Sequence, residues 1–161
     1  MCGIAGFISK NKISEFTLEK MTNSLAHRGP DSSGTFFETN SNNIKIGLGH
    51  RRLSIIDLSE RGTQPMKFNE NIIIYNGEVY NFKEIKDDLL KIGYKFETDT
   101  DTEVILKSYN EWGINFINKL NGMFAITIFD KKKNKIFLIR DRVGVKPLYY
   151  YYKDGLFMFA S

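Results

Sequence analysis

The order of strand-like and helix-like segments along the chain most constrains how this sequence can fold. Short runs rich in apolar, β-branched or aromatic residues, typical of strands, occur at 3–8, 34–38, 44–52, 72–75, 123–129, 136–139, 148–152 and 156–159. These runs follow one another at both ends, and the helix-like segments lie mainly between them. Because βαβ units alternate single strands with helices, this order instead predicts an α+β protein, with antiparallel sheets and helices packed outside.

Three segments have the spacing and boundary residues of helices. The first covers about 15–27, where apolar residues recur at helical spacing. The second runs over about 82–92, with Asn81 as its expected N-cap. The third begins at Thr100, where Glu103 completes the pattern of a capping box. These boundaries place two helices in succession between the two groups of strands.

Length and composition favour one globular domain over residues 1–161. A chain of 161 residues, of which 42% are hydrophobic, can bury a core without covalent or metal cross-links. The single cysteine excludes an internal disulfide, and with only two histidines it cannot form the usual zinc sites. The net charge of +4 comes from scattered basic residues, which argues against nucleic-acid binding.

No segment has the features of a membrane span or a secretion signal. No run approaches the roughly 20 apolar residues that a transmembrane helix needs. The apolar start at 1–7 lacks the basic flank and the length of a signal peptide. We therefore expect no membrane partner and a cytoplasmic location, where a single thiol stays reduced.

Cys2 is the strongest chemical signal, because it directly follows the initiator methionine. Aminopeptidases remove Met1 when the second residue is small, which would leave cysteine at the amino terminus. An α-amine ordinarily titrates near pH 8 and a thiol near 8.5, so the amine could accept the proton of its own thiol. One residue would then supply nucleophile and base, as in N-terminal threonine enzymes. The alternative is a small buried side chain with no chemical role.

The pair Asn76-Gly77 follows a strand-like run at 72–75, which we expect to end there. A side-chain amide and a backbone N–H could point at one oxygen and form an oxyanion hole. Glycine would let the backbone approach the substrate closely. The alternative is a type I′ turn, for which Asn-Gly is a frequent pair.

Arg52 and Asp101 are candidates for binding the two charged groups of a free amino acid. An arginine can hold an α-carboxylate with two hydrogen bonds, and an aspartate can hold an α-ammonium group. The alternatives are a surface ion pair for Arg52 and a first-turn acid that interacts with the helix dipole for Asp101. The two histidines, His27 and His50, have no partner at metal-ligand spacing, and we interpret both as structural.

Six motifs in this order and spacing resemble one family. They are MCGIAG at 1–6, HRGPD at 27–31, GHRRLSIID at 49–57, NGEVYN at 76–81, TDTEVI at 100–105 and RDRVGVKPLY at 140–149. Together they resemble the class II glutamine amidotransferase domains, which are N-terminal nucleophile hydrolases. The residues of these motifs are most similar to those of glutamine-hydrolysing asparagine synthetases, and the resemblance spans the whole chain.

The resemblance implies a fold and a set of residue roles. The fold is a four-layer α/β/β/α sandwich with the amino-terminal cysteine at a sheet edge. Cys2 resembles the nucleophile that attacks the side-chain amide of glutamine, and Asn76 and Gly77 resemble the oxyanion hole. Arg52 is similar to the arginine that binds the α-carboxylate, and Asp101 to the acid that binds the α-ammonium group. The resemblance adds further residues to the glutamine pocket, namely Leu53, Ile56 and Glu78.

The reaction that the resemblance implies passes through a γ-glutamyl thioester, releases ammonia and then releases glutamate. L-Glutamine is the expected substrate, and no metal or cofactor is expected in this chain. ATP and Mg²⁺ would belong to the synthetase domain that such enzymes carry, and no glycine-rich phosphate loop occurs in this sequence. We therefore expect the synthetase domain to be absent. Because the chain stops on the apolar run at 157–161, we expect residues 1–161 to be a glutaminase domain truncated at its C-terminal end.

Two alternative functions and one question of assembly remain open at this point. The domain could serve a related amidotransferase with a different acceptor for the ammonia. It could be a non-catalytic regulatory or docking module. It could also form a homodimer, on which the sequence gives no information.

Overall fold

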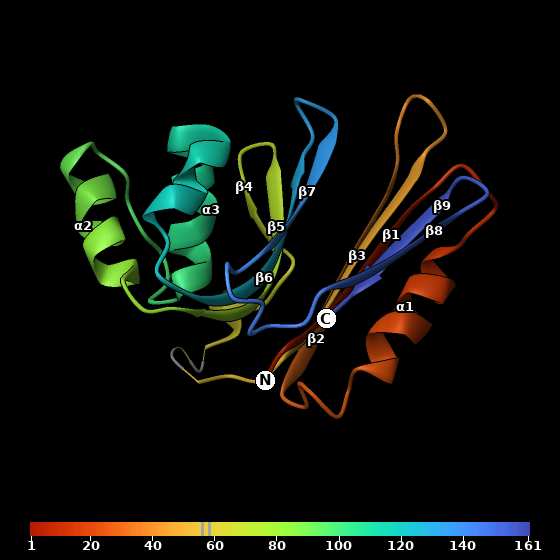
Figure 1. The fold of residues 1–161 in the computed structure, drawn as a ribbon, viewed down its shortest axis with the longest axis horizontal. Coiled ribbons are helices and arrows are strands. Elements are labelled where there is room, and N and C mark those ends of the chain that lie inside the picture. Colours follow the sequence, from red (N-terminus) through yellow and green to blue (C-terminus); the bar gives the residue numbers. More distant parts are fainter. Residues whose placement is uncertain (56, 58) are drawn as a thin grey trace.

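The computed structural model describes residues 1–161 except Ile56 and Leu58, and it forms two facing sheets with helices outside them (Figure 1). The strands are β1 (Gly3–Ser9), β2 (Ser32–Thr39), β3 (Lys45–Arg52), β4 (Met66–Phe68), β5 (Asn71–Val79), β6 (Gly122–Asp130), β7 (Lys135–Arg140), β8 (Tyr149–Lys153) and β9 (Leu156–Ala160). The helices are α1 (Glu15–Ser24), α2 (Phe82–Lys91) and α3 (Asp101–Trp112), with 3₁₀ turns η1 (Glu60–Gly62) and η2 (Gly113–Lys119).

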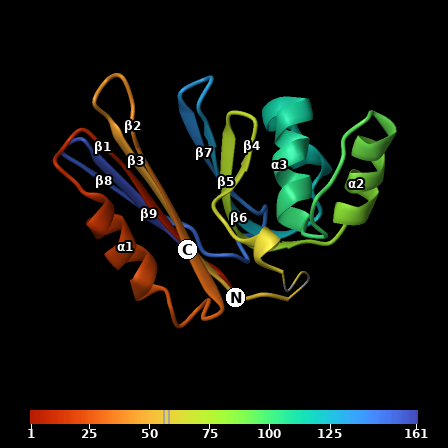
Figure 2. The same cartoon turned by 180° about the vertical axis from the view of Figure 1, so that it is seen from behind.

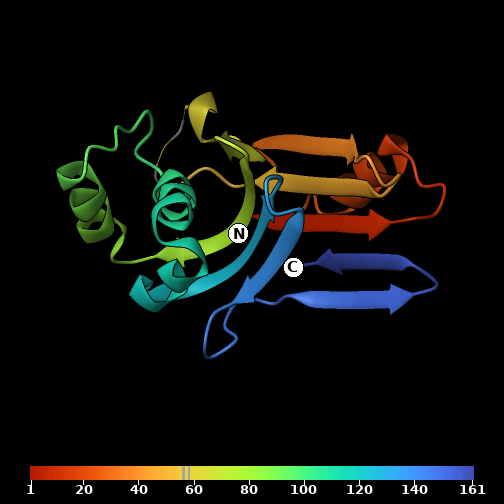
Figure 3. The ribbon, with the colours of Figure 1, turned by 90° about the horizontal axis from the view of Figure 1, so that it is seen from above.

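All the paired strands run antiparallel. One sheet has the order β2-β3-β1-β9-β8 and the other has the order β4-β5-β6-β7. Figure 3 shows β1 between β3 and β9, so the first strand lies inside its sheet. Ser161 continues this pairing, because its N–H donates to the carbonyl oxygen of Ile4. The two ends of the chain consequently lie close together.

The layers follow from which faces of the sheets are apolar. Apolar side chains of both sheets fill the space between them, among them Ile4, Leu48, Ile74 and Phe129. A second cluster lies between the four-stranded sheet and the pair α2 and α3. Helix α1 covers the outer face of the five-stranded sheet (Figure 2). The predicted four-layer α/β/β/α sandwich is therefore confirmed.

Close contact between α1 and its sheet depends on a small residue in β3. A Cβ atom added to Gly49 would lie 2.0 Å from the hydroxyl oxygen of Thr22 in α1. Leu18 of the same helix is fully buried against this face. The glycine thus lets the helix pack directly on the backbone of the strand.

The predicted end of a strand at Asn76-Gly77 is wrong, because β5 continues through both residues to Val79. Asn76 and Gly77 pair with Ala125 and Phe124 of β6, so no turn forms there. A Cβ atom at Gly77 would lie 2.2 Å from the carbonyl oxygen of Met123. The glycine is needed for close strand approach and not for a turn conformation.

The predicted helix starts are confirmed in position, but the capping contacts differ in detail. Thr100 caps α3 as expected, since its hydroxyl accepts from the N–H of Glu103. Asn81 precedes α2, but its side chain donates to the carbonyl oxygen of Lys119 and accepts from the N–H of Asn121. The short edge strand β4 has no counterpart in the sequence prediction.

Candidate active site

A cavity of about 140 Å³ opens where the ends of β1, β3 and β5 meet the start of α3. Its lining includes every predicted site residue whose position is described: Cys2, Arg52, Leu53, Asn76, Gly77, Glu78 and Asp101. Ile56, also predicted for the pocket, lies outside the described residues. The lining residues come from segments far apart in the sequence, so the fold itself assembles the site.

Cys2 directly precedes β1, and the pairing of β1 with β3 determines its neighbours. Gly3 pairs with Arg51, which places the thiol beside the end of β3. The Cys2 Sγ atom lies 3.4 Å from the backbone nitrogen of Leu53 and 3.7 Å from its carbonyl oxygen. The side chain is half-buried and faces the cavity. A thiol in this position can reach a ligand without moving the sheet.

Asn76 is held with its amide nitrogen toward Cys2. With the amide oriented to match its neighbours, Nδ2 donates to the carbonyl oxygen of Cys2 at 2.9 Å. Its Oδ1 accepts from the Arg28 guanidinium at 3.2 Å. Arg28 therefore fixes which end of the amide faces Cys2. The next residue, Gly77, lines the same cavity.

Arg52 is buried, which contradicts the alternative of a surface ion pair. Only 7% of the residue is exposed. Its guanidinium donates to the carbonyl oxygens of Ser59 and Asp57, and the Nη1 contact with Ser59 measures 2.6 Å. No carboxylate among the described residues forms an ion pair with Arg52. The charge of this arginine is held in place by backbone oxygens and is available to an anionic ligand group.

Asp101 is the first residue of α3, and its carboxylate points into the cavity. Its Oδ2 atom accepts from the hydroxyl of Tyr75 at 2.8 Å and from the N–H of Val79 at 3.1 Å. Burial raises the pKa of Asp101, and these hydrogen bonds oppose the rise. Glu78, exposed at the rim of the cavity, adds a negative charge that also raises the pKa of Asp101.

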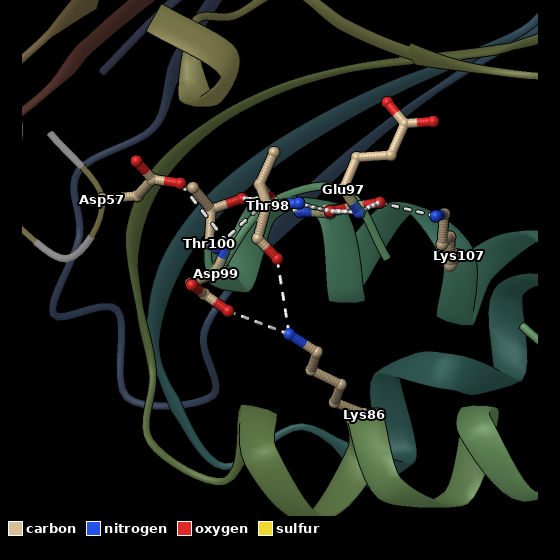
Figure 4. A network of polar contacts seen from close by, with 8 residues as sticks. Asp57, Lys86, Glu97, Thr98, Asp99, Thr100 and Lys107 are labelled. Atoms are coloured by element: carbon tan, nitrogen blue, oxygen red, sulfur yellow. Dashed lines mark hydrogen bonds and ion pairs between the residues drawn. The ribbon is translucent and has the colours of Figure 1, made fainter. Parts of the chain in front are cut away.

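A polar network holds the segment that leads into α3 (Figure 4). The Glu103 carboxylate accepts from the backbone nitrogens of Glu97 and Thr98, at 3.0 and 2.7 Å. Lys107 forms a buried ion pair with Glu103 at 2.5 Å. These contacts replace the expected bond from Glu103 back to the N-cap. They fix the first turn of α3, and with it the position of Asp101.

The histidines differ from each other in environment. His50 of β3 is fully buried, and its Nε2 atom lies 3.2 Å from the carbonyl oxygen of Tyr75. Burial lowers the pKa of His50 to about 4. His27 is exposed, and neither residue lines the cavity.

Four residues that the sequence reasoning did not assign to the site contribute to it: Arg28, Gln64, Tyr75 and Lys146. Arg28 and Lys146 lie in motifs already noted, which is a signal that could have identified them. Lys146 is 4% exposed, and its ammonium group contacts the Met1 sulfur. Tyr75 and Gln64 carry no local signal, because their roles depend on contacts across the fold.

A model of the family described as glutamine amidotransferase domain matches residues 1–161. The chain belongs to this family. The relatives of this amidotransferase domain include asparagine synthetase [glutamine-hydrolyzing] 3 of Bacillus subtilis, 41% identical over the whole chain and over 26% of that protein's length. A Methanocaldococcus jannaschii protein, named provisionally as a glutamine-hydrolyzing asparagine synthetase, is 47% identical over the whole chain. The chain spans about a third of that protein. The domain thus matches the amidotransferase part of asparagine synthetases.

Solved structures show the same fold at low sequence identity. The glutamine phosphoribosylpyrophosphate amidotransferase of B. subtilis, complexed with ADP and GMP, superposes with a TM-score of 0.79 at 20% identity. The match covers 99% of this amidotransferase domain and 41% of that chain. Within the described residues, no helix is long and apolar enough to cross a membrane.

Proposed function

We propose that this domain hydrolyses L-glutamine to glutamate and ammonia, with Cys2 as the nucleophile. The observation that carries the proposal is that one cavity joins a thiol at the amino terminus to a buried arginine and a buried aspartate. Opposite charges in one pocket match the α-carboxylate and α-ammonium groups of a free amino acid. A peptide lacks one or both of these charges within its chain, so the pocket favours a free amino acid.

Binding uses the groups that the fold has already fixed. The Arg52 guanidinium receives the α-carboxylate, and Asp101 receives the α-ammonium group. Leu53 and Glu78 line the remaining wall, and Ile56 is assigned to the pocket from the family resemblance. The side chain of glutamine then extends toward Cys2, with its amide carbon near the sulfur. Holding the reactants in this way lowers the entropic part of the barrier.

The chemistry begins after Met1 has been removed. The free α-amine of Cys2 accepts the thiol proton, and the sulfur attacks the amide carbon of glutamine. The negative charge on the former carbonyl oxygen is stabilised by the Asn76 amide and the Gly77 N–H. The α-ammonium group returns the proton to the departing nitrogen, and ammonia leaves a γ-glutamyl thioester. Water then attacks the thioester, assisted by the same amine, and glutamate and the free thiol result.

The proposal extends to the setting of the domain. Residues 1–161 are proposed to form one glutaminase domain whose reaction uses no metal or cofactor. A synthetase domain or partner, supplied with ATP and Mg²⁺, would consume the ammonia, because the relatives are about three to five times longer than the match. A cytoplasmic location follows from the need to keep the Cys2 thiol reduced. A homodimer is part of the same proposal, and a measurement of the oligomeric state tests it.

The test is intact mass spectrometry after incubation with a diazo-ketone analogue of glutamine. Cys2 is the only cysteine, so a single thiol adduct identifies its own position. We expect loss of Met1 and one adduct, which excess glutamine prevents. A processed chain that forms no adduct and releases no ammonia from glutamine contradicts the proposal. Retention of Met1 would instead support the non-catalytic module.

A further inference from the structure

Two buried tyrosine–aspartate pairs occur in this structure, and only one of them faces the cavity. The Tyr75 hydroxyl of β5 donates to Asp101 Oδ2 at 2.8 Å. The Tyr109 hydroxyl of α3 donates to Asp130 Oδ2 at 2.7 Å, at the far end of β6. Tyr75 and Asp101 both line the cavity, and Tyr109 and Asp130 do not. In the described part of the chain, the same contact therefore occurs once in the candidate site and once outside it.

The contact from Tyr75 determines how the Asp101 carboxylate is presented. Tyr75 and the N–H of Val79 both donate to the Oδ2 atom, and these two contacts hold the carboxylate where Asp101 lines the cavity. Gln64 holds Tyr75 in turn, because its Oε1 accepts from the Tyr75 N–H at 2.6 Å. The Gln64 Nε2 donates to the Thr102 hydroxyl at 3.0 Å, which ties β5 to the first turn of α3.

The contact also influences the charge of Asp101. An aspartate that binds an ammonium group must be ionised, and burial together with the charge of Glu78 works against ionisation by raising its pKa. A hydroxyl that donates to the carboxylate favours the ionised form. Burial and Asp101 raise the pKa of Tyr75 well above its ordinary value, so Tyr75 remains a proton donor. Among the described residues, those with charged or titratable groups that line the cavity with Asp101 are Met1, through its α-amine, and Cys2, Arg52, Asp57, Tyr75, Glu78 and Lys146.

We propose that Tyr75 is a positioning residue that acts through Asp101 on the α-ammonium group of the substrate. The proposal rests on the proposed function, since it assigns Asp101 to that ammonium group. Among the described residues, no hydrogen bond joins the Tyr75 hydroxyl to the Cys2 thiol. Loss of the Tyr75 hydroxyl is therefore expected to weaken substrate binding more than it slows the chemical step.

The test compares Tyr75→Phe with Tyr109→Phe in the processed chain. Each substitution removes one hydroxyl from a buried aspartate and leaves the aromatic ring. Tyr75→Phe is expected to raise the glutamine KM about tenfold while kcat changes less than about threefold, which corresponds to the loss of one hydrogen bond to a charged group. Tyr109→Phe is expected to leave KM within about twofold of the unmodified chain.

A second measurement does not depend on activity. The side-chain carboxyl carbon of Asp101, followed by ¹³C NMR against pH, reports its ionisation directly. In Tyr75→Phe the midpoint of the Asp101 titration is expected to lie about one pH unit higher than in the unmodified chain. In Tyr109→Phe the midpoint is expected to be unchanged.

The outcomes separate this proposal from the proposed function. An Asp101 titration that does not move in Tyr75→Phe overturns the positioning role, whatever the activity. An equal rise of KM in Tyr109→Phe also overturns it, because the effect would then be a general loss of packing. If the Asp101 titration moves but no protein binds or hydrolyses glutamine, the proposed function fails while the coupling of Tyr75 to Asp101 stands.

Discussion

The Nε2 atom of His50 lies 3.2 Å from the carbonyl oxygen of Tyr75, so a side chain of one sheet contacts the backbone of the other. A carbonyl oxygen only accepts hydrogen bonds, so Nε2 carries the proton of a neutral ring. The Nδ1 atom is buried and has no hydrogen-bond partner in the part of the chain that is described. Protonation of Nδ1 would place an unpaired charge between the sheets.

This contact predicts a loss of stability in mild acid. The unfolded chain binds a proton at His50 near pH 6.5, whereas the folded chain does so only near pH 4. Between these values the unfolded state holds more protons, so the free energy of unfolding falls as the pH falls. Urea unfolding should show a loss of about 2 kcal/mol from His50 between pH 7 and pH 5.

The matched comparison is His50→Gln against His27→Gln. His50→Gln should remove this part of the pH dependence, while His27→Gln, at an exposed position, should retain it. If the free energy of unfolding changes equally with pH in both variants, His50 does not cause the loss of stability in acid.

Cys2→Ala should abolish the release of ammonia from glutamine. Removing the nucleophile is expected to lower kcat at least about 10³-fold, because the remaining groups only bind and polarise the substrate. The melting temperature should stay within a few degrees, since among the described residues the half-buried thiol forms hydrogen bonds only with the backbone of Leu53. Ammonia release that persists in the variant would exclude Cys2 as the nucleophile.

Asn76→Ala should lower kcat about 10²- to 10³-fold with little change of KM, because the amide acts on charge that develops during the reaction. Asn71→Ala is the control, since Asn71 is a buried asparagine on the same strand, where it contacts Asn110. Steady-state kinetics of both variants distinguish loss of an oxyanion donor from weakening of β5. Equal effects on kcat would contradict the assigned role.

Asp101→Asn should raise the glutamine KM about 10²-fold, because the neutral amide cannot pair with an ammonium group. In the unmodified chain, glutamine affinity should decline as the pH falls toward the pKa of Asp101, which burial raises above its ordinary value. In Asp101→Asn, the affinity for glutamine should not decline over the same pH range. Isothermal titration with glutamine on Cys2→Ala backgrounds measures binding without turnover, and an unchanged affinity would remove Asp101 from the ammonium site.

Much of the fold was predictable from local patterns, because helix caps and hairpin turns act over a few residues. The start of α3 at Thr100 and the positions of strands β8 and β9 were predicted. The course of β5 through Asn76-Gly77 was not, since the same two residues are also typical of a turn. Pairing with β6 decides between these outcomes, and that pairing joins residues about 50 positions apart.

The candidate site was likewise predictable where residue types or motifs indicate a role, and not where the role depends on contacts between distant residues. Cys2, Arg52 and Asp101 were identified because their residue types suit the chemistry, and the family motifs added the other pocket residues. Tyr75 and Arg28 were not assigned, because each acts through a residue that is distant in the sequence. A buried hydroxyl or guanidinium gains its role only when the fold supplies its partner.

The position of β1 between β3 and β9 has a consequence for the order of events on the ribosome. Ala5 pairs with Gly49 on one side and with Ala160 on the other, so the second pairing joins segments that are synthesised far apart in time. Contacts of such long sequence separation form late in folding. Until residues 156–160 emerge, one edge of the strand behind Cys2 stays open and the amino terminus is accessible to a peptidase. The proposed cleavage of Met1 from the nascent chain can thus precede closure of the sheet, so that the proposed nucleophile is freed before its surroundings are complete.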